Sequence, residues 1–165
     1  MSGLFYTHID DSPVGPLLLA GDHDALHVLS FGSGSRPRQI DASWQPDTKG
    51  VLKDVRKELD QYFAGRLKQF STPVAFNGTQ FQNAVWQELQ RIPYGETLSY
   101  LDLAKRIKKP AAVRAVGMAN GANPIAIIVP CHRVIGSNGS LTGFGGGLPT
   151  KRALLELEKG QRTLL

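Results

Sequence analysis

The clearest candidate for covalent chemistry is Cys131, the only cysteine among the 165 residues. It lies in the segment Pro130-Cys131-His132-Arg133-Val134, behind a proline that restrains the backbone and before two residues that can carry positive charge. The thiolate is the nucleophilic form of cysteine, and neighbouring cations favour it. Because adjacent side chains rarely point the same way, we expect His132 to reach the sulfur through a water molecule. The pattern predicts a nucleophile; the alternative is a buried cysteine that serves only in packing.

The glycine-rich segment Gly136–Gly147 follows this cysteine closely. It does not match a phosphate-binding loop, because no Gly-Lys-Ser/Thr sequence follows it. It also lacks the third glycine of the dinucleotide-binding fingerprint after Gly143 and Gly145. Two interpretations stay open: a flexible loop that passes close to a flat ligand, with Phe144 as a stacking surface, or a tight irregular turn.

Composition argues against several classes of protein. A single cysteine cannot form an internal disulfide, and an unpaired thiol suits a reducing compartment, so we expect a cytoplasmic protein. The N-terminal segment lacks the features of a secretory signal. The sequence also has no run of about eighteen apolar residues, the length that could span a membrane. His8, His23 and His27 lie in strand-like segments without a cysteine partner, so we predict no metal site.

The net positive charge of the protein lies in the half of the chain that contains Cys131. Residues 1–78 hold 8 Lys or Arg and 9 Asp or Glu, a net charge of −1. Residues 79–165 hold 11 Lys or Arg and 5 Asp or Glu, a net charge of +6. This asymmetry is typical of a half that binds a polyanion, although a well-solvated surface would give the same numbers.

The first 78 residues are expected to form one domain, which ends at the Asn77-Gly78 turn. Apolar segments bounded by turn residues indicate strands, and apolar residues at helical spacing indicate a helix. On this basis the sequence predicts strands at Leu4–Ile9, Leu17–Ala20, Ala25–Phe31 and Pro73–Phe76, a loop at Gly32–Pro46 and a helix at Val51–Phe63.

Residues 79–165 are expected to form a second, mostly helical domain. Thr79–Gln82 has the pattern of a capping box, and it opens an amphipathic helix that ends at Ile92-Pro93. Ser99 is placed to cap the next helix, which a tight connection joins to a helix at Ala111–Gly121. Such a pair has the proportions of a helix-turn-helix, a shape found both in DNA binding and in plain packing.

The elements around Cys131 explain how it could be positioned. The helix at Ala111–Gly121 consists largely of alanine and glycine, with Arg114 as its only charged side chain, so its backbone can approach another surface closely. The apolar run Ile125–Val129 predicts a buried strand that brings Cys131 to the rim of a core. A last helix, Thr150–Glu158, presents leucines as a packing face.

Together these motifs resemble the O6-alkylguanine-DNA alkyltransferases. The resemblance covers nearly all of residues 79–165, and the five residues around Cys131 are highly specific. It rests on Phe81, Val85-Trp86, Ile92–Thr97, Ser99-Tyr100, Ala112–Gly117, Asn120–Pro124, Val129–Gly136, Thr142–Gly147 and Lys151–Glu158.

The resemblance implies an α+β fold with two domains. Residues 1–78 would form a ribonuclease H-like α/β domain with a small antiparallel sheet, and residues 79–165 a helical domain with a winged helix-turn-helix. The implied partner is double-stranded DNA that contains O6-alkylguanine, bound by a monomer that could also assemble cooperatively on DNA. In a bacterium the protein would associate with the nucleoid.

The implied activity is direct-reversal repair by a methylated-DNA–protein-cysteine methyltransferase. The damaged nucleotide leaves the helix, and Cys131 takes the alkyl group from O6 of the guanine. The resemblance implies O4-alkylthymine as a second substrate. The resemblance gives His132 the role of base through a water, Glu158 that of orienting the histidine, and Asn123 that of bracing the turn before the active site. The thioether is stable, so each molecule acts once and needs no cofactor.

The resemblance also implies which residues contact DNA and the flipped base. Arg114 would fill the vacated place in the helix, and Tyr100 would crowd the 3′ phosphate and hydrogen-bond the guanine. The carbonyls of Cys131 and Val134 would accept from the guanine amino group. The amide of Gly145 would face O6, and Gly146 and Phe144 belong to the same loop, with Phe144 standing where the family usually has tyrosine. That departure removes a hydroxyl while keeping a stacking surface.

Three other functions fit parts of the sequence. A non-catalytic alkyltransferase-like protein would bind lesions but lacks the cysteine that this chain has. A winged-helix transcription regulator would be basic but would not need a Cys-His pair behind a buried segment. A cysteine hydrolase would use the same pair and turn over repeatedly.

Overall fold

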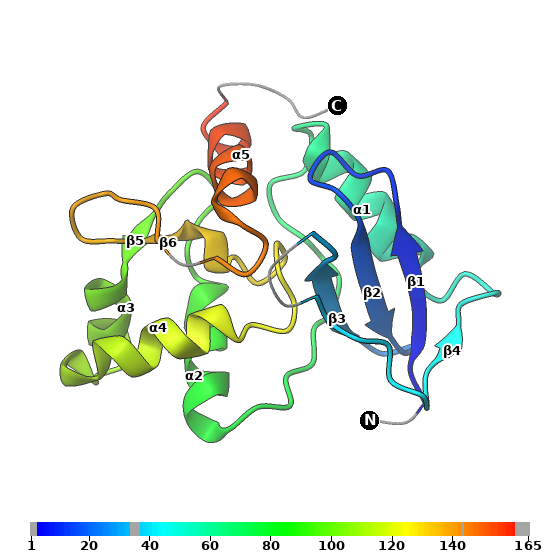
Figure 1. Cartoon of the computed structure of the whole chain (residues 1–165), viewed down its shortest axis with the longest axis horizontal. Coiled ribbons are helices and arrows are strands. Elements are labelled where there is room, and N and C mark those ends of the chain that lie inside the picture. The colour runs from blue at the N-terminus through cyan, green and yellow to red at the C-terminus, as the bar shows by residue number, and fades with distance from the viewer. Residues whose placement is uncertain (1–2, 34–36, 143, 161–165) are drawn as a thin grey trace.

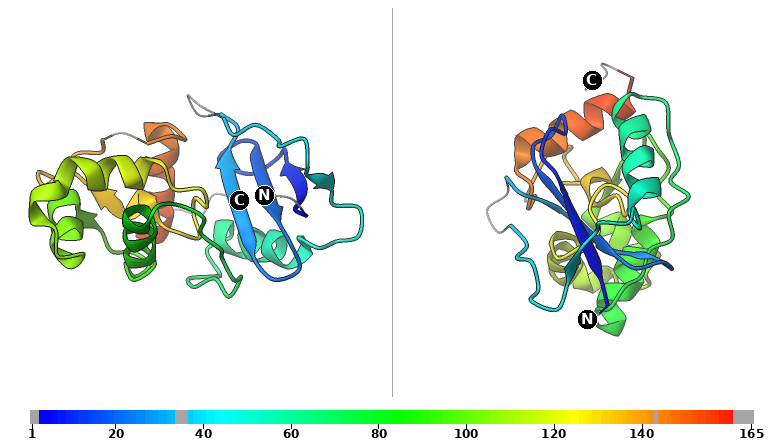
Figure 2. Two further views of the ribbon diagram at one scale, coloured as in Figure 1. Left: turned by 90° about the horizontal axis from the view of Figure 1, so that it is seen from below. Right: turned by 90° about the vertical axis from the view of Figure 1, so that its right-hand side faces the viewer.

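The computed structural model describes residues 3–33, 37–142 and 144–160. Figure 1 shows the N-terminal sheet and one helix on the right, the C-terminal helices on the left, and the last helix above and between them. The two lobes are also separate in the left view of Figure 2. No helix in the described part of the chain is long and apolar enough to cross a membrane.

The N-terminal lobe is built on a four-stranded sheet in the order β3-β2-β1-β4. β1 (Phe5–Ile9), β2 (Leu17–Gly21) and β3 (Leu26–Phe31) lie where the sequence predicts strands, and they are antiparallel neighbours, as the resemblance implies. The two-residue β4 (Gln45–Pro46) lies within the expected loop and runs parallel to β1.

Both faces of this sheet are covered, which explains why every residue of the central strand β2 is buried. On one face Leu17 and Leu19 join a core with helix α1 (Lys53–Phe63). On the other face Leu18 and Ala20 pack with Trp44. Helix α1 buries the residues at helical spacing, namely Val55, Leu59, Tyr62 and Phe63.

In the part that the structure describes, the C-terminal lobe has four α-helices and a two-stranded sheet. α2 (Gln80–Leu89) has the expected capping box at Thr79, and Ser99 caps α3 (Tyr100–Arg106). A 3-10 turn (Pro110–Ala112) leads into α4 (Val113–Gly121), and α5 is Leu148–Glu158. α3 and α4 form the helix-turn-helix, and the expected α+β class is confirmed.

The segment Ile125–Val129 is buried as expected, but the prediction of a strand there is wrong. It is a compact turn, in which the Val129 amide donates to the Ile125 carbonyl (3.1 Å) and Ile127 adopts a left-handed φ of 69°. Only Ile125 forms a bridge, with Leu29 of β3. An apolar run indicates that a segment is buried but does not specify its backbone conformation. Here the side chain of Asn123 hydrogen-bonds the Ile125 amide and the Val129 carbonyl, and these bonds stabilise the turn.

The predicted strand Pro73–Phe76 is likewise reduced to one bridge, between Val74 and Leu26. The structure instead adds a short parallel pair in the C-terminal lobe, β5 (Leu98–Ser99) with β6 (Val134–Ile135). β6 follows Cys131 by three residues, so this pair fixes the segment that leaves the candidate nucleophile.

β3 joins the two lobes through its outer edge. Its Leu29 amide donates to the Pro124 carbonyl, and the Leu29 carbonyl accepts from the Ala126 amide, both at 2.9 Å. The largest core cluster also runs without interruption from β2 and α1 into α2, α4 and α5. The turn before Cys131 is therefore held by backbone hydrogen bonds from the N-terminal half.

Candidate active site

Cys131 begins a 3-10 turn, Cys131–Arg133, and is only 6% exposed. Burial raises the pKa of its thiol, while a hydrogen bond from Asn123 and the charge of Lys151 act in the opposite direction without outweighing it. The expectation that Arg133 would stabilise the thiolate is wrong, because its guanidinium binds Glu158 instead. The resting residue is a thiol that needs a base.

His132 is suited to be that base. Its Nε2 lies 2.7 Å from Glu158 Oε2, and the side chains are 0% and 1% exposed. Since a carboxylate can only accept, Nε2 carries the hydrogen and Nδ1 keeps its lone pair. Nδ1 is buried and has no hydrogen-bond partner among the described residues.

Burial is the main cause that keeps the His132 imidazole neutral near pH 7. Burial lowers the pKa of His132, the attraction of Glu158 opposes that shift, and the charges of Arg133 and Lys151 add to it. Burial acts to raise the pKa of Glu158, but the charges and hydrogen bonds of His132 and Arg133 hold it well below its usual range. The result is a neutral base oriented by a carboxylate anion.

Asn123 occupies the position expected of a brace. Its Nδ2 donates to the Val129 carbonyl at 2.8 Å, and its Oδ1 accepts from the Ile125 amide at 3.0 Å. These bonds close the turn that precedes Cys131.

A pocket of about 120 Å³ opens beside Cys131. It is smaller than the roughly 300–1,000 Å³ of ordinary small-molecule sites, so we expect it to widen when a base enters. Its walls come from both lobes: Leu29, Ser30 and Phe31 of β3, Asn120, Gly121, Asn123 and Ala126, and Phe144, Gly145 and Gly146 of the glycine-rich segment.

The glycine-rich segment is held down by aromatic contacts. The Phe144 and Phe31 rings lie 5.5 Å apart, tilted by 56°. A Cβ atom at Gly146 would lie 2.5 Å from the Phe31 ring, whereas Gly145 has open space around it. The segment thus lies at the pocket and is fixed there by Phe31, while the role of Phe144 as a stacking surface for a ligand stays a prediction.

We expect Gly146→Ala to lower the free energy of unfolding by about 1–3 kcal/mol, because the added methyl group must displace the Phe31 ring. Chemical denaturation followed by fluorescence measures this loss. In the double variant with Phe31→Ala the clash disappears, so the two losses should sum to more than the loss in the double variant. Strictly additive losses would contradict the proposed contact.

The residues expected to contact DNA lie around the helix-turn-helix. Arg114, near the start of α4, is exposed and makes no hydrogen bond or ion pair with the described residues. Tyr100 begins α3 and lies half-buried, with its hydroxyl 3.4 Å from the Thr142 carbonyl. The two are thus presented by adjacent helices, while Phe144, Gly145 and Gly146 lie at the pocket with Cys131.

Sequence reasoning missed two polar contacts to the carbonyls of the site. The fully buried Lys151 donates to the Val134 carbonyl (2.6 Å) and to the Thr142 carbonyl (3.2 Å). Asn120 Nδ2 donates to the Cys131 carbonyl at 3.4 Å. The Cys131 carbonyl also accepts from the Val134 amide, so these donors hold the carbonyls of the site in place. Burial lowers the pKa of Lys151, and the cysteine sulfur opposes that shift.

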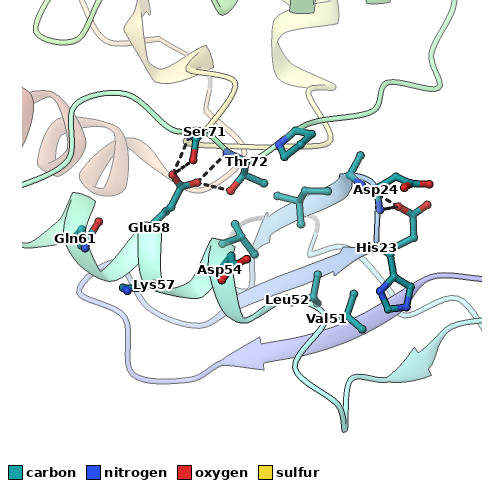
Figure 3. A pocket seen from close by; sticks show the side chains of 15 residues that line it. His23, Asp24, Val51, Leu52, Asp54, Lys57, Glu58, Gln61, Ser71 and Thr72 are labelled. Atoms are coloured by element: carbon teal, nitrogen blue, oxygen red, sulfur yellow. Dashed lines mark hydrogen bonds between the residues drawn. The ribbon is translucent and has the colours of Figure 1, made fainter.

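A larger hollow of about 410 Å³ lies in the N-terminal lobe, and Figure 3 shows its lining. Glu58 points from α1 to Ser71 and Thr72, whose backbone amides donate to it at 2.8 and 3.0 Å. Asp22 similarly accepts from the Asp24 and Ala25 amides. These carboxylates already have partners, so the hollow is explained as a structural junction.

No group of three or more His, Cys, Asp or Glu side chains in residues 3–33, 37–142 and 144–160 is arranged to hold a metal ion. The prediction of no metal site stays a prediction.

Two family models match the chain. The model described as 6-O-methylguanine DNA methyltransferase, DNA binding domain, matches residues 80–160, and the one described as its ribonuclease-like domain matches residues 4–76. The methylated-DNA–protein-cysteine methyltransferase of Methanosarcina acetivorans is 50% identical over 153 residues, which are 93% of this chain and 97% of the relative.

Solved structures agree with these matches. Mycobacterium tuberculosis OGT in complex with DNA is 50% identical and superposes with a TM-score of 0.89, over 97% of this chain and 98% of that one. The M. tuberculosis O6-methylguanine methyltransferase gives a TM-score of 0.83 at 50% identity, over 96% of this chain and 94% of that one.

Proposed function

The chain belongs to the 6-O-methylguanine DNA methyltransferase family, and from this membership we propose that it repairs DNA by direct reversal, as a methylated-DNA–protein-cysteine methyltransferase. The observation that carries the proposal is the geometry of Cys131, a buried thiol on the wall of a pocket and next to a histidine with an unpartnered Nδ1. DNA is its partner, and we propose that the bound form is a duplex containing O6-alkylguanine.

The proposed reaction is a displacement at the alkyl carbon. As Cys131 Sγ attacks, its proton passes through a water to His132 Nδ1, and Glu158 stabilises the imidazolium that forms. The Sγ–carbon bond forms while the carbon–O6 bond breaks, and the electron pair of that bond stays on the guanine. Guanine then takes up one proton, so the thiol hydrogen is in net exchanged for the alkyl group.

Binding of the base is proposed to use backbone groups of Cys131 and Gly145, which line the pocket, and of Val134, which follows Cys131 closely in the chain. The Cys131 and Val134 carbonyls would accept from the guanine amino group, and the Gly145 amide would donate to O6 where negative charge develops. Phe144 offers a stacking surface without the hydroxyl usual at this position. We expect the missing hydroxyl to change the affinity for the base or the range of alkyl groups accepted. Independently of Phe144, we propose O4-alkylthymine as a second substrate.

DNA engagement is proposed to fall to the basic half. The net charge of +6 on residues 79–165 favours contact with phosphates. The thin helix α4 would approach the duplex closely, with Arg114 in the place of the flipped nucleotide and Tyr100 against the 3′ phosphate. We propose a monomer that needs no cofactor and can assemble cooperatively on DNA, and we expect it in the cytoplasm, on the nucleoid in a bacterium.

The test of this function is a single-turnover assay with a duplex containing one O6-methylguanine. We expect a burst of one product molecule per protein, and a protein heavier by one methyl group, which peptide mapping locates on Cys131. Continued release of product after the burst would instead support a hydrolase or another turnover enzyme, and would overturn the acceptor role.

A further inference from the structure

We propose that Tyr62, on helix α1 of the N-terminal half, is a positioning residue for alkyl transfer, because its hydroxyl holds the carboxylate that orients His132. The inference rests on the proposed function and extends it to a residue far from Cys131 in the sequence. It gives the N-terminal half a part in the reaction, through Glu158 and His132.

The contact is short and shielded from water. Tyr62 is 0% exposed, and its hydroxyl donates to Glu158 Oε2 at 2.5 Å. The same oxygen lies 2.7 Å from His132 Nε2 and 3.0 Å from an Arg133 nitrogen, while Oε1 accepts from Arg133 Nε at 2.7 Å. A carboxylate offers about four acceptor positions. The hydrogen bond from Tyr62 is the fourth one to this carboxylate, after one from His132 and two from Arg133.

Packing alone does not require this hydroxyl. The Tyr62 ring contacts the rings of Phe63, Phe70 and Tyr94 at centroid distances of 5.4–6.3 Å, contacts that phenylalanine would also make. A buried hydroxyl is unfavourable unless it finds a partner, and its partner here is the carboxylate that also binds the base.

The charged and titratable groups around Glu158 come from four elements. Tyr62 reaches it from α1, His132 and Arg133 from the 3-10 turn, and Tyr94 faces the cluster from the segment after α2. Lys151, from α5 itself, adds positive charge near His132. Burial, followed by the charge of Glu158, raises the pKa of Tyr62 well above its usual value, so the phenol stays protonated and remains a donor.

Loss of this donor changes the basicity of His132 in a defined direction. Without the Tyr62 hydroxyl, Oε2 keeps more negative charge for the His132 N–H, which favours the imidazolium and raises the pKa of His132. A protonated Nδ1 cannot accept the thiol proton. The acid side of the pH–rate profile should therefore move to higher pH.

The experiment compares the intact protein with Tyr62→Phe and with Tyr94→Phe as the matched control. Both substitutions remove a phenol hydroxyl from the same aromatic cluster, but only Tyr62 hydrogen-bonds Glu158. Single-turnover rates of methyl transfer from an O6-methylguanine duplex are measured across the pH range, and the melting temperature of each protein is recorded. We expect Tyr62→Phe to react about tenfold more slowly near pH 7, the scale of losing a partner that orients a reacting histidine.

The outcomes separate the two proposals. A slower reaction with the acid side of the profile at higher pH in Tyr62→Phe, and an unchanged profile in Tyr94→Phe, supports the positioning role. A uniform loss at every pH, or a wild-type profile, overturns it while the methyl transfer of the wild-type protein still stands. If the wild-type protein transfers no methyl group, the proposed function fails and the positioning role fails with it.

Discussion

Cys131→Ala is expected to abolish methyl transfer, by on the order of 10⁶-fold, the scale seen when a protein loses its nucleophile. Cys131 is the only cysteine in the sequence, so no second thiol can replace it. The measurement is the intact mass of the variant after incubation with excess O6-methylguanine duplex.

Two further observations make this prediction specific. Cys131→Ala removes only the sulfur from a site held by backbone bonds, so we expect the variant to keep its fold and its affinity for the damaged duplex. Cys131→Ser keeps a similar shape, but a hydroxyl is a far weaker nucleophile, and it should fail as well. A methyl group found on either variant would place the acceptor elsewhere.

Arg114→Ala is expected to slow repair of duplex DNA by about 10–100-fold. Unstacking a base costs a few kcal/mol, and the variant loses the side chain that we expect to fill the vacated place and so offset part of that cost. Arg114 makes no bond with the described residues and lies on a helix of small side chains, so its loss should leave the fold intact. Single-turnover rates on a duplex carrying O6-methylguanine provide the measurement.

The comparison substrate is the free base O6-methylguanine, which needs no flipping. Its reaction with Arg114→Ala should match that of the wild-type protein. Arg114→Lys keeps the charge but not the planar guanidinium, and therefore distinguishes a phosphate contact from occupation of the vacated stack. Equal losses on duplex and free base would remove Arg114 from the flipping step.

The sequence predicted the strands, helices and caps well where local signals were strong. The capping box at Thr79 and the apolar strands β1 to β3 are present as expected. Its failure at Ile125–Val129 has a physical cause, since an apolar run reports burial equally well for a strand and for a compact turn. The division of the chain after Gly78 stays a prediction.

The candidate site was predictable where residues are neighbours in sequence and less so where the fold joins distant segments. Cys131 and His132 are adjacent and their own pattern indicated a nucleophile with a base, whereas the roles of Asn123 and Glu158 were assigned by resemblance. A signal for Lys151 existed, because helical spacing places it with Leu154 and Glu158 on the packing face of α5, where an unpaired charge is costly. No local pattern could show that Phe31 and Tyr62 reach this site, because strand and helix periodicity indicate only that they are buried.

Both edges of the N-terminal sheet are protected against pairing with other chains. The outer edge of β3 forms hydrogen bonds with the segment around Val74 and with the turn before Cys131. β4 is two residues long and contains Pro46, which has no amide hydrogen to donate. An acceptor protein that is used up molecule by molecule must be kept in reserve in its unreacted form. A sheet whose edges are paired or blocked resists aggregation with other chains. The bonds that hold the active-site turn therefore also help to keep the unreacted protein soluble until it meets a lesion.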